Sequence, residues 1–113
     1  MSRYHRLSDQ FAVSPQITVA DVAEAAALGF GFIVNNRPDD EGGPEQPSSA
    51  QVEAAAQAAG LQYRHLPVLG AFQTPEQAAE LAVLLSELPR PLLMFCRSGT
   101  RSANLYQMAL ASR

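Results

Sequence analysis

Cysteine is nearly absent from this sequence, since Cys96 is the only one among 113 residues. A single thiol excludes an intramolecular disulfide and any metal site built from several cysteines. The two histidines, His5 and His65, lie far apart in the chain, so we expect neither a metal nor another cofactor. A free thiol is typical of a reducing compartment, and a cytoplasmic location is the expectation.

Lysine is missing altogether, and all eight basic residues are arginines, against eleven acids. The formal net charge of -3 argues against nucleic-acid binding, which needs a basic surface to neutralise phosphates. Long hydrophobic runs are missing too, because the longest aliphatic stretches, 81–85 and 92–95, are far too short to cross a bilayer. The polar residues 1–6 do not lead into an apolar stretch of the kind found in signal peptides. We therefore expect no nucleic-acid partner and no membrane contact.

The chain does contain enough apolar material for one hydrophobic core. Hydrophobic residues make up 47% and charged residues 17%, which is typical of a globular protein, and the length suits a single domain over 1–113. Apolar segments bounded by turn residues predict four strands, and helical spacing with capping residues predicts four helices. The predicted strands are 10–14, 30–35, 61–67 and 91–95, and the predicted helices begin at 19, 48 or 49, 75 and 102 and end near 29, 60, 88 and 111.

Strand and helix alternate along the whole chain. Such alternation implies an α/β fold in which a mostly parallel sheet of about four strands is flanked by helices. The strand before Cys96 is apolar throughout and should be central. Ligands of such sheets bind at the carboxyl ends of the strands, where the segments 35–40, 68–73 and 96–101 should meet.

The segment 96–102 reads Cys-Arg-Ser-Gly-Thr-Arg-Ser and joins the last strand to the last helix. Backbone N–H groups that curl inward, together with a helix N-terminus, favour an anion. Gly99 supplies a backbone conformation that side chains obstruct, and Arg101 offers a fork of donors. These effects predict a lowered pKa for the Cys96 thiol and hence a nucleophilic thiolate near neutral pH. The alternative, an inert core cysteine, does not explain why glycine, arginine and hydroxyl residues share this turn.

Cys96 and Arg101 are the predicted catalytic residues. Arg37 is predicted to neutralise a substrate anion and Asn36 to orient the loop, although a turn with Asx hydrogen bonds explains both equally well. Arg97 should point outward, where a solvated role is as good an interpretation as substrate contact. The predicted anion-binding residues are Arg97, Ser98, Gly99, Thr100, Ser102, Asn36 and Arg37.

The segment 96–102 resembles the active loop of rhodanese-type sulfurtransferases. The segments 11–16 and 34–39 carry a second resemblance. Nearly the whole chain, about 8–112, resembles the DUF442 family, which is also called the beta-lactamase hydrolase-like, phosphatase-like domain. The resemblance implies a fold similar to that of dual-specificity phosphatases. It also implies sulfur transferase activity, as in some members, and a link to persulfide dioxygenases in sulfide detoxification.

The spacing within the loop favours sulfur over phosphate chemistry. Phosphatases of the fold that the resemblance implies carry His-Cys, five residues and then Arg. Here Phe95 precedes the cysteine, and only four residues separate Cys96 from Arg101, a spacing that resembles rhodanese. We therefore predict a sulfurtransferase that moves sulfane sulfur from thiosulfate or a low-molecular-weight persulfide, through a Cys96 persulfide, to a thiol acceptor.

A second feature concerns the general acid. A cysteine phosphatase needs an acid to protonate the leaving alkoxide, and the segment where the phosphatase pattern places it, 68–73, contains none. Asp39 or Asp40 on the earlier loop is the candidate substitute. Two alternatives to the sulfurtransferase stay open: a cysteine-based protein tyrosine or dual-specificity-like phosphatase, and a carrier module that delivers persulfide to a separate dioxygenase in trans.

Overall fold

A five-stranded sheet forms the centre of the molecule. The computed structural model describes residues 4–69, 73–87 and 91–111. The strands are β1 (His5–Ser8), β2 (Phe11–Ser14), β3 (Phe32–Asn35), β4 (Gln62–His65) and β5 (Leu92–Phe95). The helices are α1 (Val19–Ala27), α2 (Ser49–Ala58), α3 (Pro75–Glu87) and α4 (Thr100–Ala111), with a 3-10 turn η1 (Gly43–Glu45) before α2.

The strand order is β1-β2-β5-β3-β4, and every pair except β1 with β2 is parallel. β5 is therefore central, with Leu93 opposite Ala12 of β2 on one side and Ile33 of β3 on the other. The predicted α/β fold, with a mostly parallel sheet flanked by helices and the last strand in the middle, is confirmed. The predicted number of about four strands is one too low.

The strand that the sequence did not predict is β1, which pairs antiparallel with β2. Its sequence, His-Arg-Leu-Ser, is polar and mostly exposed, so it carries none of the apolar alternation that identifies a half-buried strand. Backbone pairing with β2, which follows a tight turn at Asp9 and Gln10, holds β1 in the sheet instead. His5, expected near a frayed terminus, lies in this strand.

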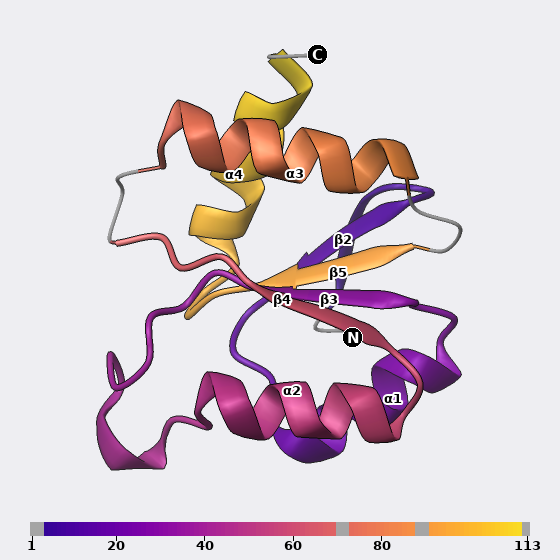
Figure 1. Cartoon of the computed structure of the whole chain (residues 1–113), viewed down its shortest axis with the longest axis vertical. Helices are drawn as coiled ribbons and strands as arrows, with labels where there is room; N and C mark the ends of the chain where they lie inside the picture. Colours follow the sequence, from indigo (N-terminus) through magenta and orange to yellow (C-terminus); the bar gives the residue numbers. More distant parts are fainter. Residues whose placement is uncertain (1–3, 70–72, 88–90, 112–113) are drawn as a thin grey trace.

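Two helices cover each face of the sheet. Figure 1 shows α1 and α2 below the strands and α3 and α4 above them. Successive side chains of a strand point to opposite faces, so Leu93 and Phe95 of β5 pack in the cluster with α1 and α2, whereas Leu92 and Met94 pack in the cluster with α3 and α4. Burial on both faces explains why β5 is apolar at every position.

The predicted helix starts are confirmed by their capping hydrogen bonds, apart from that of α4. Ser48 and Gln51 form the predicted capping box of α2, and Thr18 caps α1 with Asp21 as its partner. α4 begins at Thr100, two residues before the predicted start. The predicted end of α3 near residue 88 lies outside the described residues.

Truncation of Leu93 tests how much the central strand contributes to stability. Leu93 is fully buried between two helices and two strands, so Leu93→Ala should lower the free energy of unfolding by about 3 kcal/mol. Urea denaturation measures the change. Leu110→Ala is the matched control, because Leu110 of α4 is 40% exposed and should change stability by no more than about 0.5 kcal/mol. Equal losses in the two variants would contradict this packing.

Candidate active site

The segments that follow β2, β3, β4 and β5 meet at the carboxyl ends of these strands, on the left of Figure 1. The N–H of Asn36, just after β3, donates to the carbonyl of Phe95 at 2.8 Å, and the N–H of Val68 donates to the carbonyl of Asn36 at 2.8 Å. The N–H of Gln16 donates to the carbonyl of Arg97 at 3.3 Å. The structure thus brings the three predicted segments together and adds a fourth around Gln16.

Cys96 lies at the base of the loop that joins β5 to α4. Its side chain is fully buried, and the N–H of Gly99 donates to its Sγ at 3.0 Å. Gly99 has a φ of +92°, and a Cβ there would lie 3.5 Å from the carbonyl group of Ser14. Glycine is therefore favoured by the backbone conformation of the turn, whereas a Cβ at that distance would make only an ordinary contact with β2.

Two opposing effects set the pKa of the Cys96 thiol. Burial is the largest, and it raises the pKa because it disfavours the charged sulfur. Hydrogen bonds from the backbone and side chain of Ser102 and from the N–H groups of Ser98 and Gly99 act in the opposite direction and together outweigh burial. The pKa of Cys96 is lowered below its ordinary value, as the sequence predicted, so the thiolate is more abundant near neutral pH than in an ordinary cysteine.

Asn36 orients the hydroxyl of Ser102 beside this sulfur. Ser102 is buried in the first turn of α4, and its Oγ donates to Oδ1 of Asn36 at 2.8 Å. Nδ2 of Asn36 donates to the carbonyl of Leu66 at 2.8 Å, which fixes the amide with its oxygen toward Ser102. A hydroxyl has one proton, so Asn36 and the thiolate compete for it. Ser102 does not cap α4, because the helix begins two residues earlier.

Removal of the Ser102 hydroxyl should raise the pKa of Cys96, because one of its stabilising donors is lost. The rate of alkylation by iodoacetamide follows the thiolate fraction, so the pH–rate curve of Ser102→Ala should shift to higher pH. Ser98→Ala is the matched control, since its hydroxyl bonds Thr100 rather than the sulfur, and its curve should not move. A shift shared by both variants would contradict the specific role of Ser102.

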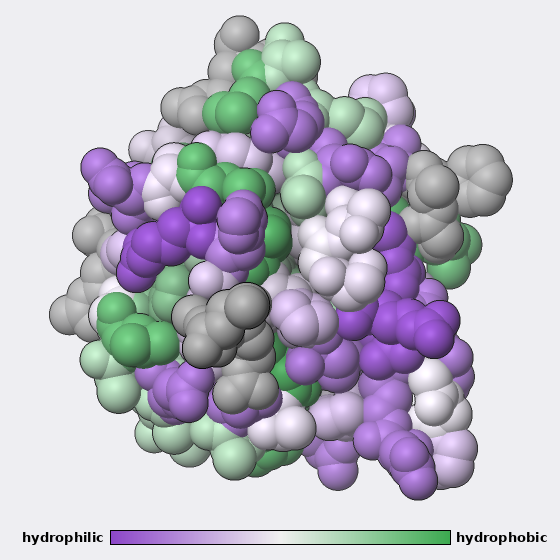
Figure 2. Space-filling view, turned by 180° about the vertical axis from the view of Figure 1, so that it is seen from behind, coloured by the Kyte–Doolittle hydropathy of each residue, from purple (hydrophilic) through white to green (hydrophobic). Residues whose placement is uncertain are grey.

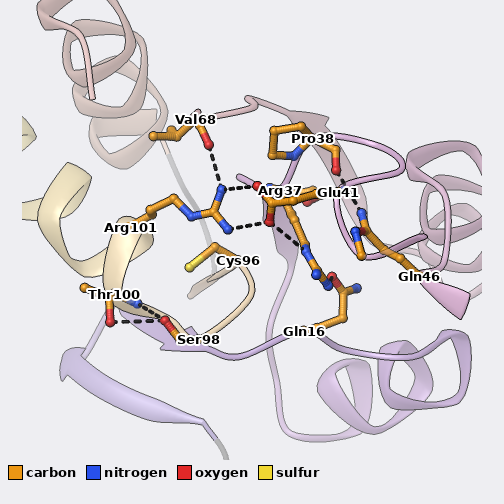
Figure 3. A network of polar contacts seen from close by, with 12 residues as sticks. Gln16, Arg37, Pro38, Glu41, Gln46, Val68, Cys96, Ser98, Thr100 and Arg101 are labelled. Carbon is orange, nitrogen blue, oxygen red and sulfur yellow. Dashed lines mark hydrogen bonds and ion pairs between the residues drawn. The ribbon is translucent and has the colours of Figure 1, made fainter. Parts of the chain in front are cut away.

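Arg101, the second predicted catalytic residue, is paired with Glu41. Nη1 donates to Oε2 of Glu41 at 2.8 Å, Nη2 donates to Oε1 at 2.6 Å, and Nη1 also donates to the carbonyl of Val68 at 2.8 Å (Figure 3). The hydrogen bond from Arg101 is the main cause that lowers the pKa of Glu41; burial opposes it and Arg37 reinforces it. The structure therefore places an ionised carboxylate at the edge of the loop.

Arg37 supports Glu41 from the other side. Its side chain is buried, with Nε donating to Oε1 of Glu41 at 3.0 Å and Nη1 donating to Oε1 of Gln16 at 3.1 Å. Its backbone carbonyl contacts Nε2 of His65 at 2.9 Å, so this histidine has a structural partner at the end of β4. The anion beside Arg37 in this structure is the carboxylate of Glu41. The contact of Arg37 with a substrate anion stays a prediction.

The remaining predicted residues lie around the loop. Arg97 is exposed, as predicted. Oγ of Ser98 donates to Oγ1 of Thr100 at 3.1 Å, and both side chains are exposed at the loop surface. Oδ1 of Asp39 accepts the N–H of Ser49 at 2.7 Å, so this acid is held at the start of α2.

Seen from behind, hydrophilic residues gather on the side of the molecule that carries the segment 36–47, whereas hydrophobic residues are scattered (Figure 2). Part of the predicted segment 68–73 falls outside the described residues. Among the described residues, no three histidine, cysteine or acidic side chains are placed to hold a metal ion. None of the described helices is long and apolar enough to span a membrane.

This arrangement defines a class of protein, an α/β domain with a buried cysteine in the loop that joins its central strand to its last helix. The sequence model of the family described as "Beta-lactamase hydrolase-like protein, phosphatase-like domain" matches residues 3–113. The chain belongs to this family. The likeness to DUF442 proteins expected from the sequence is thereby confirmed.

Relatives and solved structures agree with this assignment. The chain is 34% identical over 106 residues to the beta-lactamase hydrolase-like protein of Agrobacterium fabrum, covering 94% of this chain and 24% of the relative. It thus spans about a quarter of the length of that curated relative. A candidate phosphatase from Neisseria meningitidis has a TM-score of 0.84 at 32% identity, covering 94% of this chain and 75% of that one. A kinase associated phosphatase with its catalytic-site cysteine replaced has a TM-score of 0.71 at 16% identity over 90% of this chain and 65% of that one. The last likeness confirms the dual-specificity-phosphatase-like fold and nothing further.

Proposed function

We propose that the chain is a cysteine-dependent sulfurtransferase that forms a persulfide on Cys96. The observation that carries the proposal is the loop itself, in which only four residues separate Cys96 from Arg101 and the N–H groups of Ser98, Gly99 and Ser102 donate to a sulfur with a lowered pKa. A persulfide adds one sulfur atom to Sγ, and the terminal sulfur of that group is an anion that such donors stabilise.

The reaction proceeds in two displacements. The Cys96 thiolate attacks the sulfane sulfur of thiosulfate or of a low-molecular-weight persulfide. A new S–S bond forms to Sγ, the S–S bond of the donor breaks, and sulfite or a thiolate leaves with the electron pair. An acceptor thiolate then attacks the outer sulfur and releases the Cys96 thiolate. Arg101 and the loop N–H groups stabilise the anions formed in each step.

Two carboxylates of the site, Glu41 and Asp39, support this chemistry because both are engaged as hydrogen-bond acceptors. The pKa of Glu41 is lowered by its hydrogen bonds to two arginines, so it is ionised near neutral pH. Asp39 accepts a hydrogen bond from the start of α2. Sulfite and thiolates leave without protonation, whereas an alkoxide leaving group requires an acid, a contribution of about 10²–10⁴-fold in rate.

The second candidate function is a phosphatase, and the comparisons favour it over sulfur transfer. The family description and the similar Neisseria structure both name phosphatase chemistry. A thiolate in an anion-binding loop also suits attack on phosphorus. Because Glu41 is ionised and Asp39 is held at the start of α2, such an enzyme should prefer aryl phosphates, since phenolates leave more readily than alkoxides.

One preparation of the protein distinguishes these functions. Intact-protein mass spectrometry after incubation with thiosulfate or glutathione persulfide should show the mass gain of one sulfur atom, which a reducing agent removes and Cys96→Ser does not acquire. Sulfur transfer to cyanide and hydrolysis of an aryl phosphate are then measured side by side. Fast hydrolysis without a sulfur adduct would overturn the sulfurtransferase and support the phosphatase.

A persulfide carrier would give a different pattern. It would acquire the sulfur adduct but transfer it slowly to cyanide or glutathione, and addition of a persulfide dioxygenase in trans would accelerate loss of the adduct. An enzyme that turns over rapidly on its own contradicts the carrier function.

A further inference from the structure

Protein atoms occupy some of the N–H donors of Arg101 and leave the others available. A guanidinium has five N–H bonds, arranged as two parallel pairs and one single donor. The pair at the tip, one N–H from each Nη, is taken by the two oxygens of Glu41, and the second N–H of Nη1 is taken by the carbonyl of Val68. The pair that remains consists of Nε–H and the second N–H of Nη2.

The remaining pair forms the side edge of the guanidinium, a second fork whose two N–H groups can donate to two oxygens of an anion. Figure 3 shows the guanidinium above Cys96, with Glu41 beside its tip and Val68 on the side away from the sulfur. The pKa of Arg101, which is raised mainly by Glu41, is raised further by charge interaction and hydrogen bonding with Cys96. Engagement of the tip by protein atoms therefore leaves the side edge directed at the thiolate.

Glu41 is itself held in place. Arg37 donates to Oε1, the oxygen that also accepts from Nη2 of Arg101. The guanidinium of Arg37 in turn packs against Gly42, where a Cβ would lie 2.5 Å from its Nη2. The side chains of Arg101 and Glu41 are only 13% and 29% exposed, so solvent screens their ion pair less than it does a surface pair.

We infer that Glu41 is a positioning residue, which fixes the guanidinium of Arg101 so that its Nε/Nη2 edge is presented to the substrate anion above Cys96. The inference rests on the proposed role of Arg101 in anion binding and holds for a sulfur or a phosphate substrate. In the opposite interpretation, Glu41 mimics the substrate and blocks Arg101, which requires its carboxylate to lie against the Nε/Nη2 edge. Instead, the carboxylate binds the tip of the guanidinium, formed by Nη1 and Nη2.

Glu41→Gln tests the inference, with Glu45→Gln as the matched control from the same exposed segment. Protection of Cys96 from iodoacetamide by thiosulfate, sulfate or inorganic phosphate gives the dissociation constant of each anion without any turnover. Glu41→Gln should weaken anion binding about tenfold, equivalent to about 1.4 kcal/mol, and should raise KM for thiosulfate more than it lowers kcat. Glu45→Gln should match the wild type.

The thiol supplies a readout that general damage to the loop would not give. Loss of the Glu41 charge leaves the positive charge of Arg101 uncompensated, so the pKa of Cys96 should fall in Glu41→Gln while anion binding weakens. Damage to the ring of N–H donors would instead raise that pKa. Gly42→Ala is the second variant, because it displaces Arg37 while keeping the Glu41 carboxylate, and it should weaken anion binding in the same direction by a smaller factor.

The outcomes are separable. Tighter anion binding in Glu41→Gln would show that Glu41 competes with substrate, and unchanged binding would show that Arg101 needs no support; either result overturns the inference. If no anion protects the wild-type thiol, the anion-binding role of Arg101 in the proposed function fails first. Sulfur transfer by the wild type, with anion protection weakened about tenfold in Glu41→Gln and by a smaller factor in Gly42→Ala, supports the proposal.

Discussion

Cys96→Ser is expected to lose sulfur transfer by about 10⁴-fold or more, the scale seen when an enzyme loses its nucleophile. A serine hydroxyl stays protonated near neutral pH, whereas the Cys96 thiol has a lowered pKa. The donors described around the sulfur are the loop N–H groups and Ser102, whereas His65 contacts the carbonyl of Arg37. Steady-state transfer from thiosulfate to cyanide measures the loss.

The same variant must remain folded for the result to count. Serine fits the space of cysteine at the end of β5, so urea denaturation should give a midpoint close to that of the wild type. A folded Cys96→Ser that retains more than about a tenth of the activity would contradict a covalent mechanism through this sulfur.

Arg101→Lys is expected to lower kcat/KM by about 10²–10³-fold, comparable with the loss of an oxyanion donor. Lysine keeps the positive charge but has no planar fork, so it cannot bond Glu41 and Val68 as Arg101 does and also present two donors to the substrate. Transfer from thiosulfate and from a persulfide should both be measured.

Arg97→Lys is the matched control for this prediction. It makes the same chemical change in the same loop at an exposed position, and it should lower kcat/KM by a much smaller factor than Arg101→Lys. Equal losses in the two lysine variants would show that the loop needs arginine for general electrostatic reasons and not for the fork of Arg101.

Local patterns in the sequence predicted most of the fold. The apolar run 91–95 indicated the central strand, and the serine and threonine caps indicated where α1, α2 and α3 begin. β1 escaped prediction because it is held by backbone pairing at the sheet edge, which polar residues form as well as apolar ones. The start of α4 was misplaced because residues of the anion-binding turn already belong to its first helical turn.

The site was predicted less completely than the fold. Cys96 and Ser102 could be found because they follow one another closely in a single loop, and parallel strand ends indicated that Asn36 would be nearby. Glu41 was missed. It sits among Asp39, Asp40 and Glu45 in an irregular segment, and nothing local distinguishes the acid that reaches Arg101 from those that do not. Only its contact with Arg101, which lies 60 residues further along the chain, identifies it.

The titration of the Cys96 thiol tests the central claim most directly. The ultraviolet absorbance of the thiolate is followed against pH in wild-type protein, with Cys96→Ser as the blank. The loop donors should shift the transition below the range of an ordinary thiol, near pH 8.5, with a larger thiolate fraction at neutral pH than an ordinary thiol has. A transition at or above that range would mean that burial outweighs the donors, and Cys96 would then be an inert core residue rather than a nucleophile.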